Sequence, residues 1–280
     1  MAAEGSFRYR GHRIAYEDHG EGERVLVLVH GLLMNRRMYD RLAPEMASRG
    51  NRVITVDLLG HGESDKPQDM RLYPMSSFAS QVAALVDHLD IDPPVVGGTS
   101  LGANVALELA VHHADRARAL FIEMPVLEDA LLGAALIFTP MLLGLRVAKP
   151  LLVATSEVLQ RVPRSNHLLD IFLDWLRRDP DSSRAVLEGL LFGGSAPPVE
   201  DRERIQQPAL VIGHPNDPLH PFSDADMLVE EMPGARLVDA NSILEWRVTP
   251  KRLNDELARF LDDVYVADEP AGAREEQAAG

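Results

Sequence analysis

The sequence of 280 residues contains no cysteine. This absence excludes disulfides, thiolate metal sites and a cysteine nucleophile. Basic residues are also few, because 28 lysines and arginines stand against 43 aspartates and glutamates, which gives a formal charge of −15. A chain this acidic repels phosphate backbones, so we expect no nucleic-acid partner.

Long apolar runs are missing as well. The most apolar segment, residues 130–145, is shorter than the ~20 residues that a membrane span needs, and Thr139 and Pro140 interrupt it. The opening residues lack the apolar stretch of a signal peptide. We therefore expect a cytoplasmic protein without an integral membrane span. Residues 130–145 are expected to form a buried or lid helix; the alternatives are an apolar pocket wall or a lid that touches a membrane.

The rest of the composition, 46% hydrophobic and 25% charged, is ordinary for a globular protein with a sizeable core. Short runs of Val, Ile and Leu alternate with amphipathic helical stretches, and such runs suit strands buried on both faces. Strands are expected at residues 13–17, 24–29, 52–56, 94–98, 119–122, 209–213 and 236–238. The alternation predicts an α/β fold with a mostly parallel, eight-stranded-type sheet and helices on both faces.

The helices of this alternation are expected at residues 39–49, 76–90, 101–113, 225–231 and 252–261, with Ser76 or Ser77 as the N-cap of the second. Residues 125–204 are helical and leucine-rich in pattern, and Pro140, Pro150 and Pro163 are expected to divide them into short helices. This segment is best interpreted as an inserted cap, or lid, over the sheet edge where open α/β sheets bind ligands. The predicted α/β core is then 1–124 and 205–265, followed by a tail, 266–280, of disordered composition.

The sharpest local pattern is Gly98-Thr99-Ser100-Leu101-Gly102, which follows a predicted strand and opens a predicted helix. In that context a Gly-x-Ser-x-Gly segment indicates a nucleophile elbow. The flanking glycines let strand and helix pass without a Cβ clash. The Ser100 hydroxyl would then project from the sheet edge, and the backbone N–H of Leu101 would face the oxyanion formed when the serine attacks a carbonyl.

With these residues the chain resembles the α/β-hydrolases, and the likeness extends to about Val264. It rests on the elbow, on Val29-His30-Gly31-Leu32, on residues 57–65 (DLLGHGESD) and on Gly213-His214-Pro215-Asn216-Asp217-Pro218. The resemblance implies that Leu32 supplies the second oxyanion N–H, that Asp217 is the acid, and that His30 and His61 are structural. A serine nucleophile, where some relatives have aspartate, points to acyl-transfer chemistry.

The sequence departs from that family at one place. The family carries its catalytic histidine after the last strand, but residues 239–250 contain none, and the gap falls near Ser242 or Ile243. A serine hydroxyl needs a base to become a good nucleophile. His220 is the candidate replacement, with Asp217 or, alternatively, Glu123 as the orienting acid. Glu245 also lies near the gap, but an ion pair with Arg247 or Arg252 is the simpler interpretation.

These observations favour a serine hydrolase that cleaves an ester-like bond in an apolar small molecule, with Ser100, Asp217 and His220 as catalytic residues and Leu32 and Leu101 at the oxyanion. The alternative is a catalytically impaired ligand-binding protein on the same fold, and a lyase or acyltransferase is a third. The sequence contains no metal-binding motif, phosphate loop or dinucleotide fingerprint, so we expect no metal and no cofactor. The oligomeric state stays open.

Overall fold

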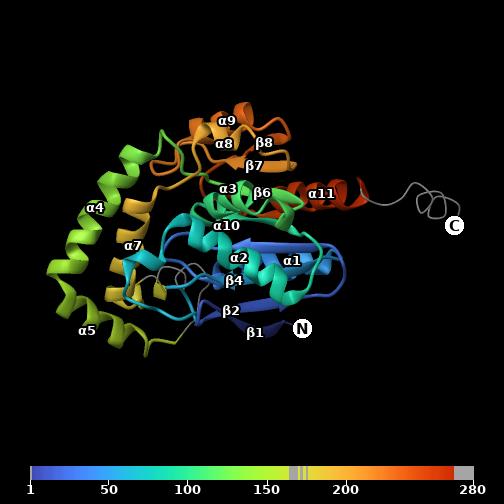
Figure 1. Cartoon of the computed structure of the whole chain (residues 1–280). Coiled ribbons are helices and arrows are strands. Elements are labelled where there is room, and N and C mark those ends of the chain that lie inside the picture. The colour runs from blue at the N-terminus through green and yellow to red at the C-terminus, as the bar shows by residue number, and fades with distance from the viewer. Residues whose placement is uncertain (1, 164–169, 171–172, 175, 268–280) are drawn as a thin grey trace, which may run out of the picture.

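The computed structural model describes residues 2–163, 170, 173–174 and 176–267 (Figure 1). Its centre is one eight-stranded sheet in the order β1-β2-β4-β3-β5-β6-β7-β8. The pairs β1–β2 and β2–β4 are antiparallel and the other five are parallel. The strands are β1 (Ala3–Tyr9), β2 (His12–His19), β3 (Val25–Val29), β4 (Arg52–Asp57), β5 (Val95–Thr99), β6 (Ala119–Glu123), β7 (Ala209–Gly213) and β8 (Ala235–Asp239). The α/β fold predicted from the sequence is confirmed.

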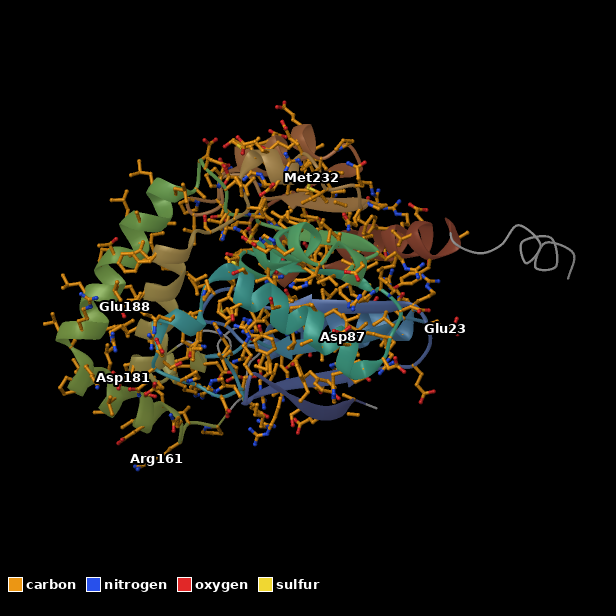
Figure 2. All side chains as sticks on the ribbon, in the orientation of Figure 1. Glu23, Asp87, Arg161, Asp181, Glu188 and Met232 are labelled. Atoms are coloured by element: carbon orange, nitrogen blue, oxygen red, sulfur yellow. The ribbon has the colours of Figure 1, made fainter. Side chains whose placement is uncertain are left out.

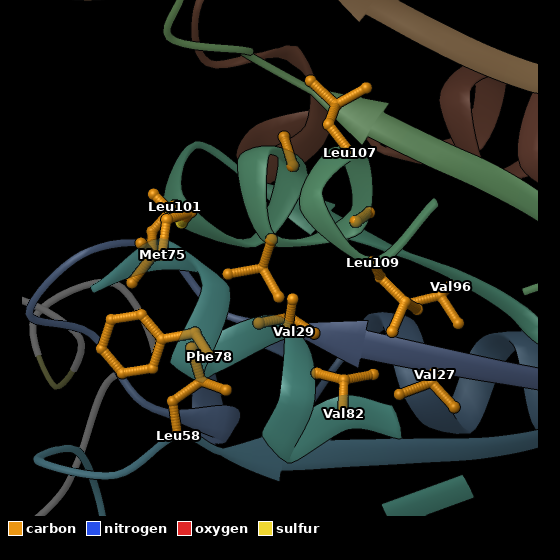
Figure 3. Close-up of a cluster of buried hydrophobic side chains, with 14 of the residues drawn as sticks. Val27, Val29, Leu58, Met75, Phe78, Val82, Val96, Leu101, Leu107 and Leu109 are labelled. Atoms are coloured by element: carbon orange, nitrogen blue, oxygen red, sulfur yellow. The ribbon is translucent and has the colours of Figure 1, made fainter. Parts of the chain in front are cut away.

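The central strands are apolar throughout because both faces of the sheet are covered. In β3, Val25, Val27 and Val29 face one core, and Leu26 and Leu28 face the other. The first core is closed by α2 (Met75–Leu89) and α3 (Leu101–His112), whose side chains Figure 3 shows, and by α9 (Phe222–Glu231). The second core is closed by α1 (Leu42–Ser48) and α11 (Lys251–Ala267). This two-sided burial is the reason that these runs do not alternate with polar residues.

Three local predictions need correction. Strand β1 was not predicted; it pairs with β2 through a tight turn in which Arg10 (φ 47°) and Gly11 (φ 87°) are both left-handed, as two-residue hairpins require. Helix α2 begins one residue early, with Pro74 at the N-cap and no side-chain cap, so neither Ser76 nor Ser77 has that position. The expected helix 39–49 is split into a 3-10 turn (Arg36–Tyr39) and α1.

The cap segment, residues 125–204, contains no strand among its described residues. Its helices are α4 (Leu131–Val147), α5 (Lys149–Leu159), α7 (Pro180–Gly193) and α8 (Val199–Arg202). Helices α4, α5 and α7 lie beside one end of the sheet (Figure 1). Ion pairs Arg146–Glu188 (2.6 Å) and Lys149–Asp181 (2.8 Å) join the outer helices to α7, where Glu188 and Asp181 are labelled in Figure 2.

Helix α4 differs from the expectation in two respects. None of its residues is buried; Leu132 and Leu136 are 72% and 68% exposed, so it is not a buried helix. It also continues through Pro140, whereas Pro150 stands in the first turn of α5, where proline is tolerated. No single helix of the described part is long and apolar enough to span a membrane; α4 and α5 pass that test only together, across a bend of 93°.

Residues 266–267, which the sequence assigned to the predicted tail, belong to α11. Residues 268–280 lie outside the part of the chain that the structure describes. The division into core, cap and tail stays a prediction.

Candidate active site

Ser100 stands between β5 and α3 in a strained backbone conformation, with φ 56° and ψ −109°. A non-glycine residue reaches that region only when its surroundings enforce it. Its N–H donates to the carbonyl of Glu123 on β6 (2.8 Å). A Cβ on Gly98 or on Gly102 would lie 1.9 Å from the carbonyl oxygen of Val29, so both positions exclude any side chain. These contacts give the sharp strand-to-helix turn that the sequence pattern predicted.

His220 and Asp217 come from the segment between β7 and α9. His220 Nε2 lies 2.9 Å from Ser100 Oγ, and His220 Nδ1 lies 2.9 Å from Asp217 Oδ2. The other oxygen of Asp217 accepts the backbone N–H groups of Leu219 (2.8 Å) and His220 (3.1 Å). The side chains of His220 and Asp217 are 11% and 4% exposed. The structure thus brings together serine, histidine and carboxylate in one hydrogen-bonded line.

The carboxylate of Asp217 is well suited to orient His220 toward Ser100. Burial alone would raise its pKa, but the hydrogen bond and charge of His220 and the two backbone donors outweigh burial and lower it. An ionised Asp217 accepts the Nδ1–H of His220, which leaves Nε2 free to accept the Ser100 proton.

Glu123, the alternative acid, points elsewhere. Its Oε2 accepts the Thr99 hydroxyl and lies 3.4 Å from Arg247 Nη2, and its Oε1 faces His214 Nε2 at 3.2 Å. Burial would raise the pKa of this carboxyl, but the charge of Arg247 and the contacts of His214 and Thr99 lower it to about 2. Of the two carboxylates considered for His220, the structure places Asp217 against it.

The loop after β8, where the family's histidine was missing, is filled by other contacts. The Ser242 carbonyl lies 3.1 Å from His214 Nδ1. Glu245 pairs with Arg252 (2.7 Å), and Arg247 reaches Glu123 instead. Of the two arginines considered for Glu245, Arg252 is therefore the partner, although Glu245 is buried and not on the surface.

Leu32 follows β3 in a tight turn that Met34 closes by donating its N–H to the Gly31 carbonyl (3.0 Å). Leu33, with φ 57°, takes the left-handed position of the turn. This turn lies against the elbow, since a Cβ on Gly31 would meet the Thr99 carbonyl at 3.6 Å. Leu32 and Leu101 line the same cavity as Ser100, which suits the oxyanion role predicted for their N–H groups.

That cavity has a volume of about 530 Å³. It extends from Ser100 under α4 and α7, and its wall is mostly aliphatic: Met75, Val126, Leu127, Leu131, Phe138, Leu187, Leu190, Leu191 and Leu219. Two of the polar lining side chains are already engaged, since the Asn104 amide donates to the Val126 and Ser195 carbonyls (2.7 and 2.6 Å) and Glu128 pairs with Arg202 (2.9 Å). The space therefore suits an uncharged apolar ligand of ordinary small-molecule size.

His30 and His61, which the resemblance makes structural, are fully buried beside one another, with ring centroids 4.6 Å apart. Burial lowers the pKa of His30 to about 4 and that of His61 well below its usual value. His30 Nε2 accepts the Leu58 N–H (3.2 Å), and His61 Nε2 accepts the Leu33 N–H (3.3 Å). Both rings thus tie neighbouring loops together.

Sequence reasoning missed one half-buried contact at this edge, made by Arg178 of the cap segment. Its guanidinium donates to the carbonyls of Gly60 (2.7 Å) and Met34 (3.4 Å). Nothing in the sequence distinguishes it from the adjacent Arg177. Among the described residues, no group of three His, Asp or Glu side chains could hold a metal ion.

A family model described as the alpha/beta hydrolase fold matches residues 24–149. The chain is 32% identical over 111 residues to the AB hydrolase superfamily protein YisY of Bacillus subtilis, an alignment that covers 37% of this chain and 40% of that protein. It is 29% identical over 219 residues to a pimeloyl-(acyl-carrier protein) methyl ester esterase of Neisseria meningitidis, which covers 75% and 82%.

Among solved structures, the enol-lactonase from Burkholderia xenovorans LB400 matches with a TM-score of 0.76 at 21% identity, over 92% of this chain and 100% of that one. The chain therefore has the α/β-hydrolase fold.

Proposed function

We propose that this protein is a serine hydrolase that cleaves an ester-like bond in an apolar small molecule through an acyl-enzyme on Ser100. The observation that carries the proposal is the hydrogen-bonded line from Ser100 Oγ through His220 to Asp217, with 2.9 Å at each step. A base within hydrogen-bonding reach of the serine, itself oriented by a carboxylate, is what serine catalysis requires.

The geometry supports the following steps. His220 Nε2 takes the proton of Ser100 as Oγ attacks the substrate carbonyl, and the N–H groups of Leu32 and Leu101 stabilise the oxyanion. His220 then protonates the leaving oxygen, and the acyl group stays on the serine. Water, deprotonated by the same histidine, attacks the ester of the acyl-enzyme and releases the acid and free Ser100. Asp217 holds the imidazole orientation throughout and stabilises its charged form.

The apolar cavity supports an ester of uncharged, mostly hydrocarbon character, because its wall is mostly apolar and the Asn104 and Glu128 side chains are occupied by other protein groups. An esterase stands among the relatives and a lactonase among the structures of the same fold, which agrees with attack on an ester carbonyl. A cytoplasmic location stays a prediction from the sequence.

A panel of p-nitrophenyl esters of increasing chain length tests the proposal. Ser100→Ala and His220→Ala should each lower kcat by about 10³-fold or more, because the serine and its base act as a unit. His112→Ala is the matched control, since His112 lies at the end of α3, is 53% exposed and pairs with Glu108; it should keep full activity. A fluorophosphonate probe should label the wild type and not Ser100→Ala. Failure to label the wild type would favour the binding-protein alternative.

A further inference from the structure

Arg178 links the cap segment to the turn that carries the Leu32 amide. It precedes α7 and is the second of two adjacent arginines. Its Nη1 and Nη2 donate to the carbonyls of Met34 (3.4 Å) and Gly60 (2.7 Å), and its Nε donates to the Ser183 hydroxyl at the start of α7 (3.2 Å). One guanidinium thus bridges the first turn of a cap helix and two separate loops of the core.

The two carbonyls that Arg178 holds both lead to the same turn. Met34 closes the turn around Leu32 and Leu33. Gly60 immediately precedes His61, whose Nε2 accepts the Leu33 N–H (3.3 Å). Hydrogen bonds therefore connect Arg178 to the turn that carries the Leu32 N–H along two routes, one through Met34 and one through Gly60 and the buried ring of His61.

Further contacts converge on these loops from the same stretch of the cap. Asn35, next to Met34, donates its side-chain amide to Asp174 (3.3 Å), and the Ser182 hydroxyl donates to the Gly60 carbonyl (3.3 Å). Gly60 has no room for a side chain, because a Cβ there would lie 2.7 Å from Val186 of α7 and 2.8 Å from the Tyr73 ring. The start of α7 is thus closely fitted to the loop that Arg178 holds.

The neighbouring Arg177 provides a natural comparison. It is buried, and its partners all belong to the cap: the carbonyls of Leu159 (2.9 Å) and Val162 (2.8 Å) and the carboxylate of Asp174 (2.8 Å). Arg177 therefore makes its own contacts inside the cap and reaches the core only through Asp174, which accepts from Asn35, whereas Arg178 bonds the core directly.

From this contrast we infer that Arg178 is a positioning residue for the oxyanion amide of Leu32, so that the cap segment sets the catalytic competence of the site as well as covering its cavity. The inference rests on the proposed function. The role needs the planar fork of arginine, whose separate N–H groups reach several acceptors at fixed angles, and the single ammonium of lysine cannot hold both carbonyls in the same way.

The test compares Arg178→Gln, Arg178→Lys and Arg177→Gln in the full chain. Misplacing an oxyanion donor weakens transition-state binding more than substrate binding. Arg178→Gln should lower kcat for p-nitrophenyl esters and the rate of fluorophosphonate labelling by about 10- to 100-fold with little change in KM. Arg178→Lys should restore part of that loss. Arg177→Gln, which removes contacts inside the cap and leaves both Arg178 carbonyl bonds in place, should change KM more than kcat.

Amide hydrogen exchange supplies a readout that does not need turnover. Exchange at residues 32–34 should rise in Arg178→Gln and stay at the wild-type level in Arg177→Gln. Equal exchange in both variants, or an Arg178→Gln enzyme with unchanged kcat and labelling rate, would overturn the inference while leaving the proposed hydrolase intact. If the wild type neither hydrolyses esters nor reacts with the fluorophosphonate, but Arg178→Gln still raises exchange at residues 32–34, the hydrolase proposal is contradicted. The structural link between Arg178 and that turn would still stand.

Discussion

Asp217 and His220 lie three residues apart in one turn, and the carboxylate of the first is joined to the imidazole of the second at 2.9 Å. The acid and the proposed base therefore come from the same short segment between β7 and α9. Because Asp217 also accepts the N–H groups of Leu219 and His220, one side chain both shapes the turn and orients the ring.

Replacing that acid separates its two tasks. In Asp217→Asn the amide oxygen can still accept the backbone N–H groups, so the turn should persist, but an amide NH₂ facing Nδ1 favours the wrong tautomer of His220. We expect kcat to fall by about 10⁴-fold with the fold retained, as for the equivalent change in other serine–histidine–aspartate sites. Steady-state kinetics beside circular dichroism would show this. An Asp217→Asn enzyme with near-normal kcat would remove Asp217 from the mechanism.

Two glycines should respond in opposite ways to the same substitution. Gly102→Ala places a methyl group 1.9 Å from the Val29 carbonyl, so the elbow must shift and the protein should lose several kcal/mol of stability or fail to fold. Gly144→Ala meets nothing within 4 Å inside α4, and should stabilise slightly, by about 0.5–1 kcal/mol, through helix propensity. Urea denaturation of both variants measures the difference. Similar stability for the two would contradict the close approach of β3 to the elbow.

The buried histidines predict a loss of stability in mild acid. Burial lowers the pKa of His30 from 6.5 to about 4, against the opposing charge of Asp57. Below pH 6.5 this histidine binds a proton in the unfolded chain, whereas in the folded chain it stays neutral until about pH 4. The contribution of His30 to the free energy of unfolding is therefore complete above pH 6.5 and is lost as the pH falls toward 4. Between pH 7.5 and pH 5 the free energy of unfolding should fall by about 2 kcal/mol because of His30, at 1.36 kcal/mol for each pH unit below 6.5.

His61 acts in the same direction, because its pKa is lowered too. Denaturation curves of the wild type and His30→Gln at both pH values check this prediction. The variant should start less stable, since it loses the bond from the Leu58 N–H, but its further loss at pH 5 should be smaller. An identical pH dependence in both proteins would exclude His30 as the cause.

The sequence predicted the sheet and the elbow because both have strong local causes. Val25–Val29 is apolar on both faces, and Gly98 and Gly102 flank a serine at a strand-to-helix junction. The hairpin of β1 was missed because a single Gly11 is a weak turn signal on its own. The exposure of α4 could not be predicted, because the sequence pattern of an apolar helix is the same whether other parts of the protein cover the helix or not.

The candidate site shows the same limit. The Gly-x-Ser-x-Gly pattern between a predicted strand and helix located Ser100, and the resemblance to the α/β-hydrolases pointed to Asp217 and Leu32. The choice between Asp217 and Glu123 as partner of His220 was open, because both lie at the same edge of the sheet and only side-chain direction separates them. Arg178 carried no signal at all: its partners in the core are backbone carbonyls, which leave no trace in residue identity.

Proline follows Asp217 and proline follows His220, so the backbone has little freedom at two of the five positions from 217 to 221. Such a restricted segment would hold the acid and the base in a fixed position relative to one another. The segment from β8 to α11 would then not need to carry a catalytic histidine, and its sequence could vary during evolution. Genome surveys that class a hydrolase as inactive because its C-terminal histidine is missing would misclassify enzymes with this arrangement of acid and base.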